Sequence, residues 1–509
     1  MDAASNNTSP RRDGGGISAP HVALGTRPGT DGFLPRWSAL LTYFAGVAER
    51  SDRVQITEIG RGWGGEPLVL LTISSPANLA NQNELRRIQR RLADQRPALS
   101  MRERADLLAR GRTICCVTCS IHPTEVGGTL MTPDLVHHLA TDDSAQTLEI
   151  LDRVVLLLIP SLNPDGWERV VDWHAESVGT EREGTIPPGL YHPVAGHDNN
   201  RDWFMRNLPE TRAVIDHVHR RWYPHVVHDL HQMSSFGPRY VVPPFIDPYD
   251  PFVHPLLQAQ ATELGTMIAA ELTGRGLVGI ATSTVFDAFS ASRAYQHYHG
   301  GVRILSEAAS ARLASPMSIA PDQLVPLHGF DPHRAAVRHP RPWPGGEWGI
   351  GDIVRHNRIA VDTTLRHAAS SRDRWVRNFA IVQADALRSR DVAAFILPPL
   401  ADQPDPAVAR DLIGLLLAGG VEVAETIGPS GPVAPGSFTV PTAQPFGAFA
   451  RTLLTDQSYP WGDKASTPYD TTTHALPLMM GVTSVGVNEP PMVESRPLAA
   501  LPPSPGGIR

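Results

Sequence analysis

A histidine and a glutamate lie three residues apart, directly after a run of apolar residues. The run Thr113–Ile121 leads into His122, Pro123, Thr124 and Glu125. If Glu125 opens a helix, the two side chains share one side of a turn and can bind a single cation. Imidazole nitrogen and carboxylate oxygen are donors that suit zinc. Because surface pairs at this spacing are also common, the motif indicates a metal site only together with further ligands.

A third ligand is expected from the strand-like segment HVVHDLHQM, residues 225–233. A catalytic zinc site combines three protein ligands with one open position. His225, His228 and His231 compete for the third place, and His231 is the predicted ligand because it lies at the carboxyl end of the apolar stretch. His228 is expected to be a packed or hydrogen-bonded strand residue. Asp229 either orients His231 or faces solvent.

A carboxylate and an amide–guanidinium pair offer the other groups that hydrolysis requires. The run Gly300–Leu305 reads as a strand that leads to Glu307. This carboxylate either takes a proton from water as a general base or is simply a solvated strand terminus. Asn200 and Arg201 stand side by side in GHDNNRDWF, where an arginine can clasp a carboxylate with two parallel hydrogen bonds. The pair predicts a substrate with a free carboxylate, with a structural salt bridge as the alternative.

The elements that position these residues alternate between strand and helix patterns. Thr113–Ile121 and Val154–Pro160 are short apolar runs that end in polar clusters and flank a helical stretch. This alternation predicts an α/β fold with a mixed, mainly parallel central sheet flanked by helices, whose ligands bind beyond the strand ends. Upstream, residues 36–49 read as an amphipathic helix and VQITEIGRGWGGEPLVLLTIS as a β-hairpin.

Composition divides the chain into five predicted segments. They are a disordered leader (1–33), a catalytic α/β domain (34–325), an irregular linker (326–385), a smaller α/β domain (386–485) and a tail (486–509). In the smaller domain, residues 393–397, 404–418 and 421–427 read as a strand, a helix and a strand, which is one βαβ unit.

Charge and hydropathy argue against two classes of partner. A net charge of -7 with 19% charged residues offers no basic field for nucleic acid. The sequence contains no apolar run of the roughly 18 residues that a membrane span needs. The first residues lack the apolar segment of a secretory signal, so a cytoplasmic location is expected, or export if the start codon is misplaced. No pattern predicts the oligomeric state.

The cysteines Cys115, Cys116 and Cys119 lie within five residues of one another. They are too close together to link distant parts of a fold by disulfides. Cys116 and Cys119 form a C-x-x-C, which metal and redox sites also use. The lack of a second pair and the β-type neighbours favour buried strand cysteines.

Five motifs, taken in order, resemble the zinc metallocarboxypeptidases of the carboxypeptidase A kind. They are HPTE (122–125), NPDG (163–166), DNNRDW (198–203), DLH (229–231) and SEAAS (306–310). The resemblance covers about residues 40–320. It implies a carboxypeptidase-like fold in which His122, Glu125 and His231 bind one zinc ion per chain and Glu307 is the general base. It also implies that Asn200 and Arg201 bind the terminal carboxylate of a peptide.

The activity implied by the resemblance is hydrolysis of the last peptide bond. Glu307 would accept a proton from zinc-activated water and return it to the leaving amine. The family also uses an arginine that polarises the scissile carbonyl and a tyrosine that caps the substrate. Arg169 and Arg182 are the candidates for the first role, and Tyr295 and Tyr298 for the second.

The segment after residue 386 is similar to the glutamine amidotransferase-like part of a large bacterial group in this family. DVAAFILPP, GSFTV, QSYP and PYDTTTHALPLMMGV carry this similarity. The segment has no cysteine to act as nucleophile, so it is predicted to be non-catalytic. Chains of that group are usually longer, which predicts a shortened or truncated member here.

Two other functions fit the same residues. The first is a zinc-dependent deacylase or amidase of amino-acid or cell-wall conjugates, and the second is a non-catalytic binding module on the same scaffold. Arg201 discriminates against a ligand without a free carboxylate, which would have no use for it. Loss of a metal ligand or of the base would mark a binding module, and all four residues are present. The preferred terminal side chain is not predicted, because residues 280–300 carry no motif.

Overall fold

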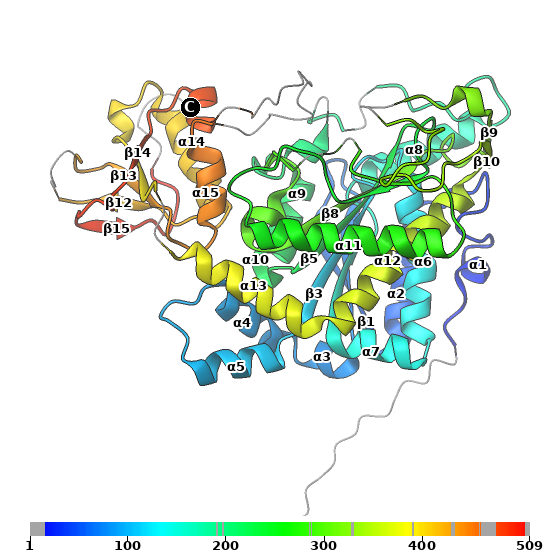
Figure 1. Ribbon diagram of the computed structural model, residues 1–509, viewed down its shortest axis with the longest axis horizontal. Helices are drawn as coiled ribbons and strands as arrows, with labels where there is room; N and C mark the ends of the chain where they lie inside the picture. The colour runs from blue at the N-terminus through cyan, green and yellow to red at the C-terminus, as the bar shows by residue number, and fades with distance from the viewer. Residues whose placement is uncertain are drawn as a thin grey trace, which may run out of the picture.

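The centre of the molecule is an eight-stranded sheet with the order β1-β2-β4-β3-β5-β8-β6-β7 (Figure 1). The structure is a computed structural model that describes residues 16–189, 192–195, 198–284, 286, 288–326, 330–388, 391–428, 433–457, 459 and 475–503. The strands are β1 (Val54–Arg61), β2 (Pro67–Ile73), β3 (Thr113–Cys119), β4 (Val154–Ile159), β5 (Val226–Met233), β6 (Tyr240–Val242), β7 (Ile280–Thr282) and β8 (Val302–Ala309). The four central strands β4, β3, β5 and β8 are parallel to one another. This mixed, mainly parallel sheet confirms the predicted fold class.

Helices cover the faces and ends of this sheet. They are α2 (Trp37–Arg50), α3 (Pro76–Ala80), α4 (Gln82–Ala93), α5 (Met101–Arg110), α6 (Val126–Thr141), α7 (Ala145–Arg153), α8 (Pro164–Ser177), α9 (Pro209–Val214), α10 (Arg220–Trp222), α11 (Pro255–Gly274), α12 (Ile350–Ser370) and α13 (Arg372–Ala386). Shorter turns are η1 (Asn199–Arg201), η2 (Ile215–His219), η3 (Tyr295–His299) and η4 (Pro321–Gln323). Helices α6, α11 and α12 pack together over β3, β5 and β8 (Figure 1). No helix in the described part of the chain has the length and hydropathy to cross a bilayer.

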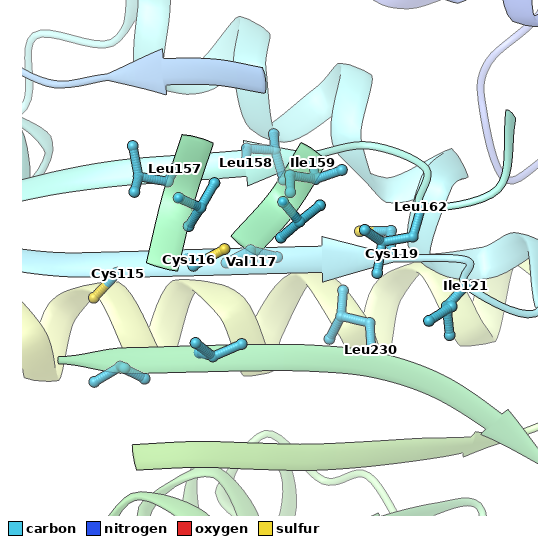
Figure 2. Close-up of a cluster of buried hydrophobic side chains, with 14 of the residues drawn as sticks. Cys115, Cys116, Val117, Cys119, Ile121, Leu157, Leu158, Ile159, Leu162 and Leu230 are labelled. Carbon is cyan, nitrogen blue, oxygen red and sulfur yellow. The ribbon is translucent and has the colours of Figure 1, made fainter. Parts of the chain in front are cut away.

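The predicted hairpin and first helix are confirmed by β1, β2 and α2. β1 pairs with β2 in antiparallel register, and α2 spans almost the residues expected from its apolar spacing. Strands β3 and β4 are buried along their whole length. Such strands read as continuous apolar runs because both faces are covered. Figure 2 shows this core, in which Cys116 and Cys119 of β3 lie among Leu157, Leu158 and Leu230.

The prediction of an irregular linker over residues 326–385 is wrong for most of that range, because α12 and α13 occupy it. Polar and apolar residues are mixed along α12, and Ile353, Val361 and Leu365 on one side of it are buried. These side chains face the sheet and its neighbouring helices, so the amphipathic pattern is real but diluted by His, Arg and Asp. A short antiparallel pair, β9 (Met317–Ile319) with β10 (Gly346–Trp348), brings the chain to α12.

The C-terminal residues form a second, five-stranded sheet of order β14-β11-β13-β12-β15 at one side of the molecule (Figure 1). Its elements are β11 (Ala394–Leu397), η5 (Leu400–Asp402), α14 (Pro406–Ala418), β12 (Ala424–Thr426), β13 (Phe438–Pro441), α15 (Gly447–Leu454), α16 (Leu476–Met480), β14 (Val485–Val487) and β15 (Ser495–Pro497). The predicted strand–helix–strand order is present, and β13 lies between β11 and β12 antiparallel to both. The similarity of this part to amidotransferases stays a prediction.

The ends of the chain contain more structure than a leader and a tail suggest. Residues 1–15 lie outside the described residues, but α1 (Pro20–Ala23) contacts α6. The backbone N–H of Gly32 donates to the carbonyl of Ala314 at 2.8 Å. Within the predicted tail, β15 pairs with β12. The segment boundaries themselves stay predictions.

The three cysteines are buried free thiols on β3, as predicted for strand cysteines. Burial raises the pKa of each thiol, so none forms the reactive thiolate at neutral pH. We expect a thiol-specific reagent to leave the native protein unmodified and to titrate three thiols after unfolding in guanidinium chloride. Rapid labelling of the native protein, measured spectrophotometrically, would contradict the burial of β3.

Candidate functional site

The turn after β3 brings His122 and Glu125 onto one side. Glu125 is the N-cap residue of α6, and its backbone N–H donates to the carbonyl of His122 at 3.0 Å. The hydroxyl of Ser120 donates to the carbonyl of Glu125 at 2.7 Å and closes the turn. The expectation that Glu125 stands at a helix start is thereby confirmed. The Nδ1 atom of His122 lies 2.7 Å from Oε1 of Glu125.

His231 joins this pair from the neighbouring strand β5. Its Nδ1 atom lies 3.0 Å from Oε2 of Glu125. One candidate donor atom from each of His122, Glu125 and His231 lies within 4.8 Å of the others. The carboxylate of Glu125 therefore stands between two imidazoles, one from the β3–α6 turn and one from β5.

Glu307 lies beside His231 on strand β8. The parallel register pairs His231 with Glu307, and register partners in adjacent strands point to the same face of the sheet. Both side chains are buried. Neither residue ends its strand, because β5 continues to Met233 and β8 to Ala309. The predicted position of Glu307 at the strand end is corrected in this respect.

Two aspartates hold the outer nitrogens of the histidines. Oδ1 of Asp198 lies 3.0 Å from Nε2 of His122, and Oδ2 of Asp229 lies 3.0 Å from Nε2 of His231. A carboxylate on the outer nitrogen fixes the tautomer and leaves Nδ1 facing Glu125. Asp229 is held in turn by Thr118 and Arg303, at 2.8 and 2.5 Å. Asp229 therefore orients His231, which was one of its two predicted roles.

Sequence reasoning missed the parts played by Asp198 and Arg303. Asp198 is the first residue of DNNRDW, so the motif contained it without indicating its contact with His122. For Arg303 the sequence did contain a signal. Side chains alternate between the two faces of a strand, so Arg303 lies on the same face of β8 as Glu307, four residues later. Ile121 directly precedes HPTE, and its carbonyl accepts hydrogen bonds from Asn163 of NPDG at 3.3 Å and from Asn199 of DNNRDW at 2.8 Å. This carbonyl therefore links the three motifs.

The charges around the site shift the pKa values of its two carboxylates in opposite directions. For Glu125 the charges of His122 and His231 outweigh burial and lower the pKa to about 2. For Glu307 burial dominates, with the charge of Glu125 adding to it, and the pKa rises to about 8. Burial alone would lower the pKa of His122, but the Glu125 charge and the Asp198 hydrogen bond raise it to about 9. Two acids in one site with opposite shifts are the pattern of distinct chemical roles.

Asn200 and Arg201 lie in η1, close to the two histidines. The amide nitrogen of Asn200 lies 3.4 Å from Nε2 of His231, and its Oδ1 accepts from the indole of Trp203 at 2.8 Å. One guanidinium nitrogen of Arg201 lies 2.9 Å from Oδ2 of Asp198. The pair thus stands at the site, where Arg201 makes a salt bridge.

The two competing histidines, His225 just before β5 and His228 within it, make hydrogen bonds in the core. His225 accepts the backbone N–H of Ile114 through Nδ1 at 2.9 Å. His228 lies 2.9 Å from the hydroxyl of Ser306 and 3.0 Å from that of Thr364 on α12. His228 is therefore a hydrogen-bonded core residue, as predicted.

The candidate arginines and tyrosines occupy different surroundings. Arg169 donates to the carbonyl of Pro188 at 3.3 Å, whereas Arg182 stacks 4.8 Å from the ring centroid of Trp173. Tyr295 and Tyr298 are both buried in η3. The roles of carbonyl polarisation and substrate capping stay predictions.

Comparisons with known proteins cover much of the chain that forms the eight-stranded sheet. Residues 40–237 match the zinc carboxypeptidase family. The matched range includes His122, Glu125, Asn200, Arg201 and His231, and Glu307 lies beyond it. No curated protein sequence matches the chain.

Three of the solved structures that are similar to this chain are metallocarboxypeptidases. A metallo-carboxypeptidase from Burkholderia cenocepacia is 16% identical, with 65% of this chain and 68% of that chain covered and a TM-score of 0.40. One from Pseudomonas aeruginosa, in complex with (2-guanidinoethylmercapto)succinic acid, is 15% identical over 64% and 68%, with a TM-score of 0.39. Carboxypeptidase A from Helicoverpa armigera is 13% identical over 69% and 74%, with a TM-score of 0.40.

The donor set fits a zinc ion. Two imidazoles and one carboxylate are a common ligand combination for catalytic zinc. The Oε2 atom of Glu125 is buried and lies near His231 without the alignment of a hydrogen bond, so this oxygen has no hydrogen-bond partner among the described residues. A cation between the three side chains would satisfy it.

Metal binding should depend on pH through His122. Its pKa of about 9 places a proton on the imidazole at neutral pH, and a metal ion binds only the neutral ring. We expect zinc affinity to rise with pH, because His122, with a pKa of about 9, and His231, whose pKa is raised well above its ordinary value, must both lose a proton. Asp198→Asn removes one of the groups that raise the pKa of His122, so this variant should release fewer protons on binding zinc at neutral pH. Calorimetry in buffers of different ionisation enthalpy measures the protons released, and a pH-independent affinity below pH 9 would refute the assignment.

Proposed function

We propose that this protein is a zinc-dependent carboxypeptidase that hydrolyses the last peptide bond of a substrate with a free carboxylate. The observation that carries the proposal is the convergence of His122, Glu125 and His231, with Glu307 in register beside His231. The family match over residues 40–237 supports a metallopeptidase, and the further detail rests on the geometry.

A zinc ion held by His122, Glu125 and His231 would supply a Lewis acid that acidifies water and polarises a carbonyl group. Glu307 accepts the proton of the attacking water and returns it to the leaving amine. Burial raises the pKa of Glu307 above its ordinary value, which makes its carboxylate form a stronger base for this step. Asp198 and Asp229 keep the histidines oriented throughout.

Arg201 gives the reaction its preference for the chain end. In the proposed complex its guanidinium binds the terminal carboxylate, with the amide of Asn200 alongside. When the carboxylate is held in place, the adjacent peptide bond is also held in place relative to Glu307. The binding energy is thus used to orient the bond for attack. Without such a carboxylate, a substrate lacks this anchor. A deacylase or amidase whose substrate has no free carboxylate would therefore not use Arg201 as an anchor.

Replacement of the base tests the mechanism. We expect Glu307→Gln to lower turnover of an N-blocked dipeptide by at least about 100-fold, because a general base contributes roughly that much or more. Zinc content should be unchanged, since Glu307 is not a proposed ligand. Glu347→Gln, an exposed glutamate on β10, is the matched control and should keep full activity. Substantial turnover by Glu307→Gln, with metal content checked by atomic absorption, would remove Glu307 from the mechanism.

Comparison of a free-acid dipeptide with its C-terminal amide tests the anchor. Hydrogen bonds to charged groups contribute about 1.5–3 kcal/mol, so Arg201→Gln should lower kcat/KM for the free acid by roughly 10- to 100-fold. The amide should be a poor substrate for both proteins and should change little. Arg153→Gln, at a surface arginine paired with Glu149, is the control. Equal wild-type activity on acid and amide would favour the deacylase instead.

A further inference from the structure

Arg303 is a buried arginine in the middle of the central sheet. It is the second residue of β8, and its side chain is only 4% exposed. One guanidinium nitrogen donates to Oδ2 of Asp229 at 2.5 Å, whereas the Nε atom is buried and has no hydrogen-bond partner among the described residues. Arginine is almost never fully buried unless it is paired. The contact with Asp229 is therefore the interaction that keeps this charge in the core.

Stability gives little reason for an ion pair at this position. Two ions taken out of water carry a desolvation cost that can exceed their attraction, and apolar replacements of such pairs are often neutral or stabilising. The unpartnered Nε atom adds to that cost, because a buried donor without an acceptor has lost its hydration. The neighbouring residues Val302, Ile304 and Leu305 are apolar and buried. A charged residue among them is therefore expected to serve the site rather than the stability of the sheet.

The carboxylate of Asp229 is held from the two strands that flank β5. Thr118 is its register partner on β3, and Arg303 on β8 pairs with the residue two positions before it, so all three side chains point to one face. The hydroxyl of Thr118 donates to Oδ1 at 2.8 Å. Arg303 donates to Oδ2, and this same oxygen lies 3.0 Å from Nε2 of His231. Arg303 thus fixes the oxygen atom that contacts the histidine.

Each proposed histidine ligand has an aspartate at its outer nitrogen and an arginine behind that aspartate. The two rows are Arg201, Asp198 and His122 on one side, and Arg303, Asp229 and His231 on the other. The arginines differ in their surroundings, because the side chain of Arg201 is 17% exposed and that of Arg303 is 4% exposed. Arg201 can reach a substrate, whereas Arg303 is enclosed by the protein.

We propose that Arg303 is a positioning residue for the metal site, which acts through Asp229 to hold His231 in the orientation that binds zinc. The inference rests on the proposed function, in which His231 is one of the zinc ligands. With Asp229 held on both oxygens, Nε2 of His231 faces the carboxylate and Nδ1 is left for the metal ion. Without Arg303 the carboxylate keeps only the Thr118 hydrogen bond. Asp229 and His231 can then rotate together, and the affinity for zinc falls.

Replacement of Arg303 tests this role, with zinc affinity as the readout. Loss of a group that orients a metal-binding histidine lowers metal affinity by about 10- to 100-fold, so Arg303→Met should bind zinc about 10-fold more weakly in competition with a chromophoric chelator. Arg303→Lys can reproduce the single charged hydrogen bond and should stay within about threefold of wild type. Arg358→Met breaks an ion pair with Asp362 on α12 and is the matched control, which should bind zinc like wild type.

A double-mutant cycle with Asp229→Asn shows whether Arg303 acts through Asp229. Asparagine keeps the shape of the side chain but not its charge, so Arg303→Met should change zinc affinity by less than about twofold in this background. Circular dichroism and thermal unfolding without zinc check that each variant folds. If Arg303→Met does not fold, Arg303→Gln, which keeps N–H donors at the buried position, takes its place in the cycle.

Three outcomes would overturn the role of Arg303. They are unchanged zinc affinity in Arg303→Met, an equal loss of affinity in both backgrounds, and slower turnover of the zinc-saturated variant without any loss of affinity. In the third case Arg303 would act on Glu307, which shares its face of β8, rather than on the metal site. Turnover of the wild type tests the proposed function separately. A protein that shows the expected zinc affinities but cleaves no peptide would lose the proposed function and keep the positioning role.

Discussion

Glu125 is a buried carboxylate with an imidazole on each side, and the arrangement of the whole site depends on it. A carboxylate taken out of water needs compensating positive charge, and removal of one partner of a buried pair costs about 3–5 kcal/mol. The protonated imidazoles of His122 and His231 can supply that charge, and they lower the pKa of Glu125 to about 2. The same three side chains can exchange their protons for a divalent cation. The site thus places positive charge beside Glu125 in both cases, whether protons on the imidazoles or a divalent cation supply it.

The register of four parallel strands meets this requirement. β3 carries the turn of His122 and Glu125, and its neighbour β5 carries His231. β8 pairs with β5 so that Glu307 stands beside His231. A shift of one residue in either register would turn a side chain to the opposite face of the sheet. Buried apolar side chains on both faces of β3 and β5 oppose such a shift, so the core of the sheet also sets the geometry of the site.

Much of this fold was predictable because buried strands and amphipathic helices have strong periodic signals. His122, Glu125 and His231 follow or end apolar runs, and strands of a parallel sheet bring such positions to one edge. The contacts of Asp198 were not predictable, since they join a loop to a turn 76 residues earlier in the chain. The helix α12 was missed for a different reason. Its buried residues are interspersed with His, Arg and Asp, and only the packed structure shows which face they share.

The C-terminal part of the chain is connected to the site by a buried hydrogen-bond network. The carboxylate of Asp250 accepts hydrogen bonds from the hydroxyls of Tyr298 in η3 and Thr452 in α15, at 2.7 and 2.5 Å. Asp250 is fully buried, and a satisfied polar group in the interior fixes the relative position of the elements that supply its donors. Because η3 leads directly into β8, α15 supports the start of the strand that carries Glu307. The hydroxyl of Tyr298 is engaged in this network, so Tyr298 helps to hold α15 against the segment that precedes β8.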